Sequence, residues 1–131
     1  MTHRRTALGA GVVAALLVAA PVAAQDAVVS DLAKSALPDA PGGEALAKHY
    51  DVPPGWTTPA HAHSGHVMLY VVRGTAELAL DGETVTATAG SLLEADAGEA
   101  MVMQNPSDDE RLEFVVFQVG PEGAPYIALV E

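Results

Sequence analysis

Residues 70–90 read YVVRGTAELALDGETVTATAG, and this stretch predicts two β-strands joined by a tight turn. Apolar residues alternate with polar ones before the turn, where Ala76, Leu78 and Leu80 share one face. The Asp81-Gly82 pair between the two runs is a strong signal for a two-residue hairpin turn. The alternation therefore predicts a hairpin with one face against a core and the other face in solvent.

Turn-forming residues also separate short runs along the rest of the chain. Gly and Pro recur at intervals of about ten residues, and runs of four to eight residues lie between them, which is typical of an all-β sandwich or barrel. Residues 45–52 form a further strand candidate. The nearly continuous apolar runs at 68–72 and 112–119 predict strands covered on both faces. Only residues 28–37 have a pattern that also fits a short helix.

The first 24 residues predict a secretory signal peptide. They have a positive start with Arg4 and Arg5, an apolar middle, and small residues before Gln25. The alternative is a membrane anchor, but residues 7–24 are short, mostly Ala, and interrupted by Gly and Pro. We therefore expect cleavage after Ala24, a periplasmic or secreted protein that no longer contacts a membrane, and a single domain over residues 25–131.

Composition excludes several classes of function. The chain has 131 residues, with 6 Lys+Arg against 17 Asp+Glu and a formal net charge of −11. Such a charge repels phosphate backbones and anionic lipids, so nucleic acids are not expected partners. The chain has no Cys, which excludes disulfides, cysteine-based zinc sites and a thiol nucleophile.

One segment carries metal-binding chemistry. Residues 55–63 read GWTTPAHAH and lead from a Pro/Gly turn into a strand. His61 and His63 are two residues apart, so on an extended chain both imidazoles point the same way. Two imidazoles placed in this way both reach one metal ion at about 2.0–2.1 Å. The pair therefore predicts the start of a mononuclear metal site.

The spacing around this pair resembles the two motifs of the cupin family. Gly55, His61, His63 and Gly74 match the first motif, and the second is matched at Gly90, Gly98 and Asn105. The resemblance spans residues 28–130 approximately. It implies a small double-sheeted β-barrel of the jelly-roll kind, and a homodimer.

Two of the four metal ligands usual in that family are replaced. Val67 stands where the resemblance places a glutamate, and Met101 stands where it places a third histidine. Asp96 replaces the proline of the second motif. The resemblance therefore implies the fold and leaves only His61 and His63 from the family's usual metal ligands.

Other side chains are candidates to complete the site. Met101 and Met103 share one face of a regular strand, and thioether sulfur together with imidazole suits copper. His66 is a further candidate ligand, and oxygen ligands are available from Glu94, Asp96 and Glu99. The alternative is that both Met side chains fill a barrel without metal and that the His pair only makes hydrogen bonds.

Three classes of function follow. The first is a secreted cupin that binds a single metal ion, with copper favoured, without turnover. The second is a metal-dependent oxygenase or isomerase, which needs a firmly held ion with open coordination positions. The third is a metal-free barrel that binds a small molecule. Fold alone does not choose among them.

Overall fold

The structure is a computed structural model that describes residues 26–131. The predicted signal peptide, residues 1–24, lies outside the described residues. The secondary structure of the described residues consists of ten strands: β1 (Val28–Ala36), β2 (Gly43–Val52), β3 (His61–His63), β4 (His66–Arg73), β5 (Thr75–Leu80), β6 (Glu83–Thr88), β7 (Leu92–Ala95), β8 (Met101–Gln104), β9 (Leu112–Pro121) and β10 (Ile127–Leu129). Across residues 26–131, the search for an apolar helix long enough to cross a membrane finds none.

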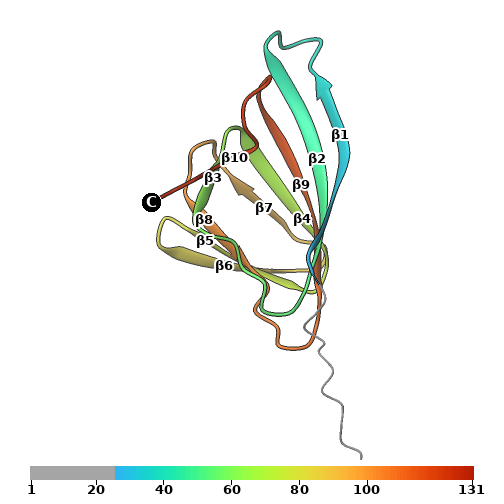
Figure 1. Ribbon diagram of the computed structural model, residues 1–131, viewed down its shortest axis with the longest axis vertical. Helices are drawn as coiled ribbons and strands as arrows, with labels where there is room; N and C mark the ends of the chain where they lie inside the picture. Colours follow the sequence, from blue (N-terminus) through green and yellow to red (C-terminus); the bar gives the residue numbers. More distant parts are fainter. Residues whose placement is uncertain (1–25) are drawn as a thin grey trace, which may run out of the picture.

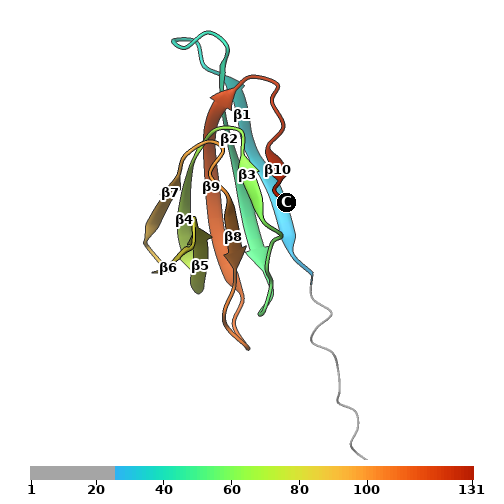
Figure 2. The same ribbon diagram turned by 90° about the vertical axis from the view of Figure 1, so that its left-hand side faces the viewer.

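The strands form two antiparallel sheets of five strands each. The first sheet has the order β1-β2-β9-β4-β7, and the second has the order β10-β3-β8-β5-β6. Figure 1 shows the second sheet lying across from the first, and Figure 2 shows β2, β9 and β4 as long neighbouring strands. This arrangement confirms the predicted all-β, jelly-roll barrel.

The hairpin predicted at residues 70–90 is present as β5 and β6. Asp81 and Gly82 have φ angles of 47° and 86°, the left-handed values that a type I′ turn requires at both central positions. Ala76 pairs with Ala87, and Leu78 pairs with Val85. Ala76, Leu78 and Ala87 are buried, so the inward face of the hairpin is the face that the alternation predicts.

The helical interpretation of residues 28–37 is wrong, because this segment forms strand β1. Every residue of β1 is exposed, and the strand pairs with β2 alone. A short segment gains little from isolated helical hydrogen bonds, whereas β2 offers a row of unpaired backbone groups along one edge. Tertiary pairing therefore overrides the local pattern.

The two apolar runs do form strands, but the prediction that both faces are covered is wrong. The inward residues of β4 and β9, such as Leu69 and Phe114, are buried. Alternate residues on the opposite face are exposed, and Tyr70 and Phe117 retain 42% and 43% of their accessible surface. Because no helix of the described residues packs on this sheet, apolar side chains of its outer face remain open to solvent.

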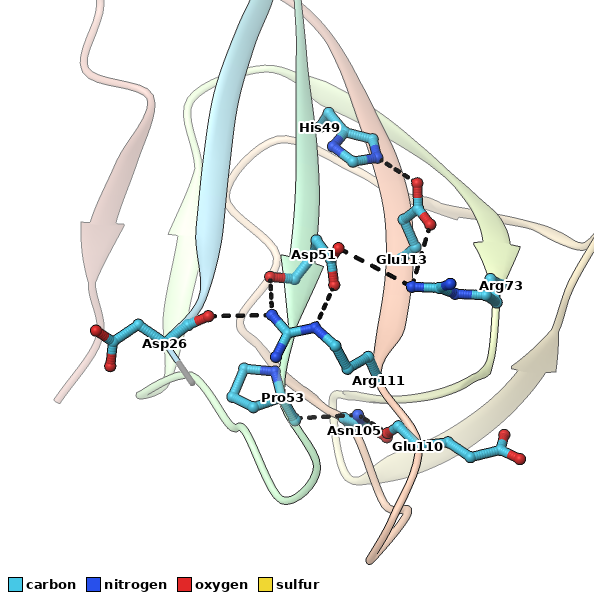
Figure 3. Close-up of polar contacts among 9 residues, drawn as sticks. All are labelled: Asp26, His49, Asp51, Pro53, Arg73, Asn105, Glu110, Arg111 and Glu113. Atoms are coloured by element: carbon cyan, nitrogen blue, oxygen red, sulfur yellow. Dashed lines mark hydrogen bonds and ion pairs between the residues drawn. The ribbon is translucent and has the colours of Figure 1, made fainter. Parts of the chain in front are cut away.

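Asn105 anchors the loops at one end of the barrel (Figure 3). Its buried amide nitrogen donates hydrogen bonds to the backbone oxygens of Pro53, at 3.1 Å, and Glu110, at 2.8 Å. Its side-chain oxygen accepts from the Ser107 backbone N–H at 3.1 Å. The asparagine of the second motif therefore holds two loops together. It does not line the cavity between the two sheets.

A polar cluster on the outer face joins β2, β4 and β9 (Figure 3). Glu113 contacts His49 Nε2 at 2.8 Å and Arg73 at 3.5 Å, while Asp51 contacts Arg111 Nε at 2.7 Å. These groups are partly exposed, and exposed ion pairs contribute only about 0–1 kcal/mol each. The cluster accounts for His49 as a structural residue outside the barrel.

Candidate metal- and ligand-binding cavity

A cavity of about 190 Å³ lies between the two sheets. Most of the side chains around it are apolar or aromatic, and they come from both sheets: Tyr50, Val67, Leu69, Phe114 and Val116 from the first, and His61, His63, Leu78, Met101 and Met103 from the second. A mostly apolar cavity with a few converging polar groups is the usual form of a small-ligand or metal site.

The two histidines of β3 line this cavity together. His61 and His63 are 6% and 5% exposed, and their ring centroids lie 5.2 Å apart in an edge-to-face arrangement. They face the same side because they occupy alternate positions of one strand. The structure thus brings both imidazoles to the same cavity.

Hydrogen bonds to Nδ1 of His61 and His63 determine which ring nitrogen is available to bind a ligand. His61 Nδ1 lies 2.9 Å from the Pro59 carbonyl oxygen, and His63 Nδ1 lies 2.7 Å from Gln118 Oε1. Both partners are acceptors, so each Nδ1 carries the proton and donates it. Each Nε2 is then left with its lone pair. An imidazole held through Nδ1 in this way is typical of metal-ligating histidines.

Burial also keeps His63 neutral. Loss of hydration is the largest effect, and it lowers the pKa of the His63 imidazole below its usual value. The neighbouring His61 lowers it further, while the hydrogen bond to Gln118 and the backbone of Tyr126 act in the opposite direction. A neutral imidazole is the form that a metal ligand requires, and burial favours this form of His63.

Two methionine side chains from β8 face the same cavity. Met101 pairs with His61 across the adjacent strands β3 and β8, and both Met101 and Met103 are buried. Met101 and Met103 are separated by one residue and therefore share a face. Two thioether sulfurs thus accompany the two imidazoles in the lining of one cavity.

The remaining predicted ligands lie elsewhere. His66 is 45% exposed at the start of β4, outside the cavity lining, and its ring nitrogens lie 3.6 Å from Glu94 and 3.4 Å from Asp96. Of the three carboxylates considered, only Glu94 belongs to the lining, and Glu99 accepts a hydrogen bond from the Asp96 backbone. Among residues 26–131, no group of three or more His, Cys, Asp or Glu side chains is placed to hold a metal ion.

Aromatic side chains form the wall at one end of the cavity. Tyr50 stacks on Phe114 with ring centroids 4.6 Å apart, and its hydroxyl lies 2.9 Å from the hydroxyl of Tyr126. The Tyr126 ring meets His63 edge-on at 4.8 Å. Burial raises the pKa of both tyrosines, so both hydroxyls remain protonated and the wall stays uncharged at neutral pH.

Two residues that shape this site were not predicted from the sequence. Gln118 is buried and accepts a hydrogen bond from His63. The one sequence feature that could have indicated this role is a polar side chain at an inward position of the apolar run 112–119. Tyr126 lies beyond the last motif, at the start of the apolar run 126–130, for which no prediction was made from the sequence. Nothing local to the sequence indicates that it returns to cover His63.

The comparisons with known proteins agree with this architecture. The family described as Cupin domain matches residues 48–118. Among curated proteins, none matches the chain. An RmlC-like cupin family protein with a double-stranded β-helix fold from Methanocaldococcus jannaschii is 25% identical, with a TM-score of 0.61 over 77% of this chain and 85% of that chain.

Two further solved structures share the fold. A cupin 2 domain-containing protein from Halorhodospira halophila is 21% identical, with a TM-score of 0.65 over 81% of this chain and 71% of that chain. The DMSP lyase DddQ from Ruegeria pomeroyi is 18% identical, with a TM-score of 0.58 over 66% of this chain and 43% of that chain. At these identities the likeness concerns the fold, and the activity must be argued from the cavity.

Proposed function

The chain belongs to the Cupin domain family, and we propose that its barrel binds a single copper ion between the two sheets. The proposed ligands are Nε2 of His61, Nε2 of His63 and the sulfur of Met101, with Met103 as a further sulfur donor. The observation that carries the proposal is that two imidazoles, each held through Nδ1, share one cavity with these thioethers.

The donor set decides which metal fits. Iron(II), manganese(II) and other hard ions favour carboxylate and water ligands, and a firmly held site of this kind needs more than two imidazoles. Val67 occupies a lining position and offers only carbon, while Glu94 is mostly exposed and directed into contact with His66. Imidazole and thioether together are a soft set, which suits Cu(I).

Burial supports the same conclusion. Met101 and Met103 are 4% and 3% exposed, and the cavity around them is predominantly apolar. The single carboxylate of the lining, Glu94, is mostly exposed, so the buried part of the site favours an ion of low charge, because the desolvation cost of a charged ion rises steeply with its charge. The family's usual metal chemistry is therefore not proposed for this chain. The proposed role is binding, buffering or sensing of copper without turnover.

Export is part of the proposal. Residues 1–24 have the three parts of a secretory signal peptide, and copper handling by a protein without cysteine is chemically reasonable outside the cytoplasm. We therefore place the protein in the periplasm or the medium. Mass spectrometry of the exported protein is expected to find an N-terminus within a few residues of Gln25, and an intact Met1 in exported protein would contradict the assignment.

A competition titration with a Cu(I) chelator tests the copper site. The wild type, His61→Ala and Met101→Leu are compared with Met68→Leu, a matched control on the outer face of β4. Leu and Met have similar volumes, so the fold is retained at a cost below about 1.5 kcal/mol. We expect weaker Cu(I) binding for His61→Ala and Met101→Leu, and wild-type binding for Met68→Leu.

The titration also separates the possible failures. Equal affinity for the wild type and Met101→Leu would reduce Met101 to a packing residue. Equal affinity for the wild type, Met101→Leu and His61→Ala would place any bound copper outside this cavity and refute the proposal. Circular dichroism of each variant establishes that the compared proteins are folded.

The cavity lining favours a second candidate function, which is metal-free binding of a small apolar molecule. Tyr50, Trp56, Phe114 and Tyr126 form an aromatic surface that suits a planar, uncharged ligand. Native mass spectrometry of the purified exported protein distinguishes the two functions. One copper ion per chain supports the first, and a retained organic molecule with no copper supports the second.

A further inference from the structure

A second cavity, which we call the outer groove, lies along the β1–β2 hairpin beside the segment that leads into β10. Figure 1 shows this hairpin extending past the second sheet. The groove has a volume of about 360 Å³, against about 190 Å³ for the cavity between the sheets. Asp31 and Leu32 of its wall are largely exposed, so solvent reaches it. Pockets for small organic ligands typically measure roughly 300–1,000 Å³, so the outer groove is large enough for one.

The charged side chains of the groove lining are balanced and lie on one face of the hairpin. There are two acids and two bases, which are Asp31, Glu44, Lys34 and Lys48. On β2, Glu44, Leu46 and Lys48 occupy alternate positions and so share a face. Lys48 lies opposite Asp31, and Leu46 lies opposite Lys34. Because opposite residues of antiparallel strands share a face, all four charges surround one apolar side chain, that of Leu46.

Two of these charges are paired within the protein, and the other two are not. Lys48 Nζ bonds Asp31 at 2.6 Å and lies 4.8 Å from the centroid of the Tyr126 ring. Within residues 26–131, Lys34 and Glu44 form no ion pair and no side-chain hydrogen bond. They are diagonal neighbours across the two strands, and such neighbours lie roughly 7–8 Å apart. One cation and one anion are therefore available on either side of a small ligand.

From this arrangement we propose that the outer groove binds a free α-amino acid with an aliphatic side chain. The ligand's carboxylate accepts hydrogen bonds from Lys34, its ammonium group donates to Glu44, and its side chain packs on Leu46 and the exposed Leu32. Both opposite charges of the ligand are then matched. The chain's net charge of −11 repels a simple anion, whereas a zwitterion carries no net charge and is not repelled.

The aromatic part of the lining favours a primary ammonium group over a quaternary one. Quaternary ammonium ligands are recognised by the faces of aromatic rings. Tyr126 is the one aromatic residue of the groove lining, and Lys48 already lies over its ring. A primary ammonium group instead needs hydrogen-bond acceptors, which the carboxylate of Glu44 supplies. A betaine is therefore expected to bind poorly, although it carries the same two charges as an amino acid.

Isothermal titration calorimetry with L-leucine tests the proposal. The exported wild-type protein is compared with Glu44→Gln and Lys34→Met, which remove one charge each and keep the approximate size of the side chain. Glu83→Gln, at an exposed position of β6 in the second sheet, is the matched control. We expect saturable binding of one leucine per chain, at least about tenfold weaker binding in Glu44→Gln and in Lys34→Met, and wild-type binding in Glu83→Gln.

Changes in the ligand test the same contacts from the other side. N-acetyl-L-leucine lacks the ammonium group, so it is expected to bind weakly and to bind Glu44→Gln no more weakly than the wild type. Glycine betaine is expected not to displace L-leucine. Because amino acids also chelate copper, the titration is repeated after a chelator has removed any copper, and the leucine affinity is expected to stay the same.

Four results would overturn the inference. They are no saturable binding of L-leucine, an affinity in Glu44→Gln or Lys34→Met that equals that of the wild type or of a weakened Glu83→Gln, displacement of leucine by glycine betaine, and loss of leucine binding together with the copper. Only the last result involves the metal, so the outer groove and the proposed copper site are tested separately.

Discussion

Gln118 Oε1 lies 2.7 Å from His63 Nδ1, and this hydrogen bond joins the two sheets across the barrel. Gln118 belongs to β9 of the first sheet and His63 to β3 of the second. The other end of the same amide donates to Ser64 Oγ at 3.1 Å, which fixes its orientation. The Gln118 amide therefore determines which nitrogen of His63 faces the cavity.

Replacement of Gln118 is expected to weaken both the fold and the metal site. In Gln118→Leu the buried His63 Nδ1–H loses its acceptor, and an unpaired buried donor costs about 1–3 kcal/mol of unfolding free energy. Loss of a group that orients a ligand typically lowers metal affinity about 10-fold to 100-fold. Urea denaturation measures the first effect and Cu(I) competition the second.

Gln118→Glu separates orientation from packing. A carboxylate retains an acceptor for His63 Nδ1–H, so Cu(I) affinity is expected to stay closer to that of the wild type than in Gln118→Leu. Gln104→Leu, at a half-buried position of β8, is the control for removal of an amide. If Gln118→Leu and Gln104→Leu have equal Cu(I) affinity, the orienting role of Gln118 is refuted.

The stability of the protein is expected to fall at alkaline pH because of the tyrosine pair. Burial raises the pKa of Tyr50 and Tyr126 above the unfolded value of 10.0. A raised folded pKa contributes stability that is complete below pH 10 and is lost as the pH rises beyond it, since the unfolded chain releases the proton first. Each group contributes a slope of up to about 1.4 kcal/mol per pH unit in this window.

Urea denaturation at pH 8 and at pH 11 measures this slope. Tyr126→Phe removes one of the two buried hydroxyls and is expected to flatten the pH dependence, whereas Tyr70→Phe, on the exposed outer face, is the matched control. Absorbance at 295 nm follows ionisation directly. Ionisation of all three tyrosines of the wild type near pH 10, without unfolding, would contradict the prediction.

Met101→His is expected to change the metal preference. The substitution places a third imidazole beside His61, its cross-strand neighbour, in the same cavity. Three nitrogen ligands suit Zn(II) and Fe(II) better than the native set, while loss of the Met101 sulfur weakens the preference for Cu(I). We expect at least tenfold tighter Zn(II) binding and weaker Cu(I) binding, measured by chelator competition.

Met68→His is the control for this substitution, because it adds the same imidazole on the outer face of β4. It is expected to leave the cavity's metal binding unchanged. A gain in Zn(II) affinity that is equal in Met68→His and Met101→His would show that the added imidazole acts outside the cavity.

Asn105 is expected to contribute to stability and not to ligand binding. Asn105→Ala removes the two hydrogen bonds that its amide donates to Pro53 and Glu110 and leaves two carbonyls without these donors. Loss of a buried, fully bonded amide is expected to cost about 2–3 kcal/mol of unfolding free energy. Asn105→Asp retains the acceptor for Ser107 but not the donors, so it should be destabilised as well.

Chemical denaturation of both variants, with Cu(I) competition on the folded proteins, checks this role. Asp108→Ala, at an exposed position of the same loop, serves as the local control. An Asn105→Ala protein that is as stable as the wild type, or that has lost Cu(I) binding while folded, would contradict a purely structural role.

Much of the fold was predictable because it depends on local pattern. The Asp81-Gly82 turn requires left-handed backbone at both central residues, and the alternation beside it decides which face is buried. The spacing from Gly55 to Asn105 was sufficient to indicate the family. These features need only neighbouring residues and fixed distances along the chain, so the sequence alone determined them.

The errors arose where long-range pairing decides the outcome. The segment that forms β1 has a pattern that fits a helix or a strand, and the free edge of β2 makes it a strand. The apolar runs in β4 and β9 predicted two covered faces, yet nothing of the described chain packs on the outer face. Propensity is a weak preference that tertiary contacts override.

The sequence by itself determined a jelly-roll barrel in which His61 and His63 share one face, because the two-residue period of a strand requires it. Only the tertiary structure decided what surrounds them. Met101 comes from the adjacent strand, Gln118 from the opposite sheet, and Tyr126 from the last turn of the chain. The physical reason is that contacts between residues far apart in sequence depend on how the two sheets pack, and no local period encodes that packing.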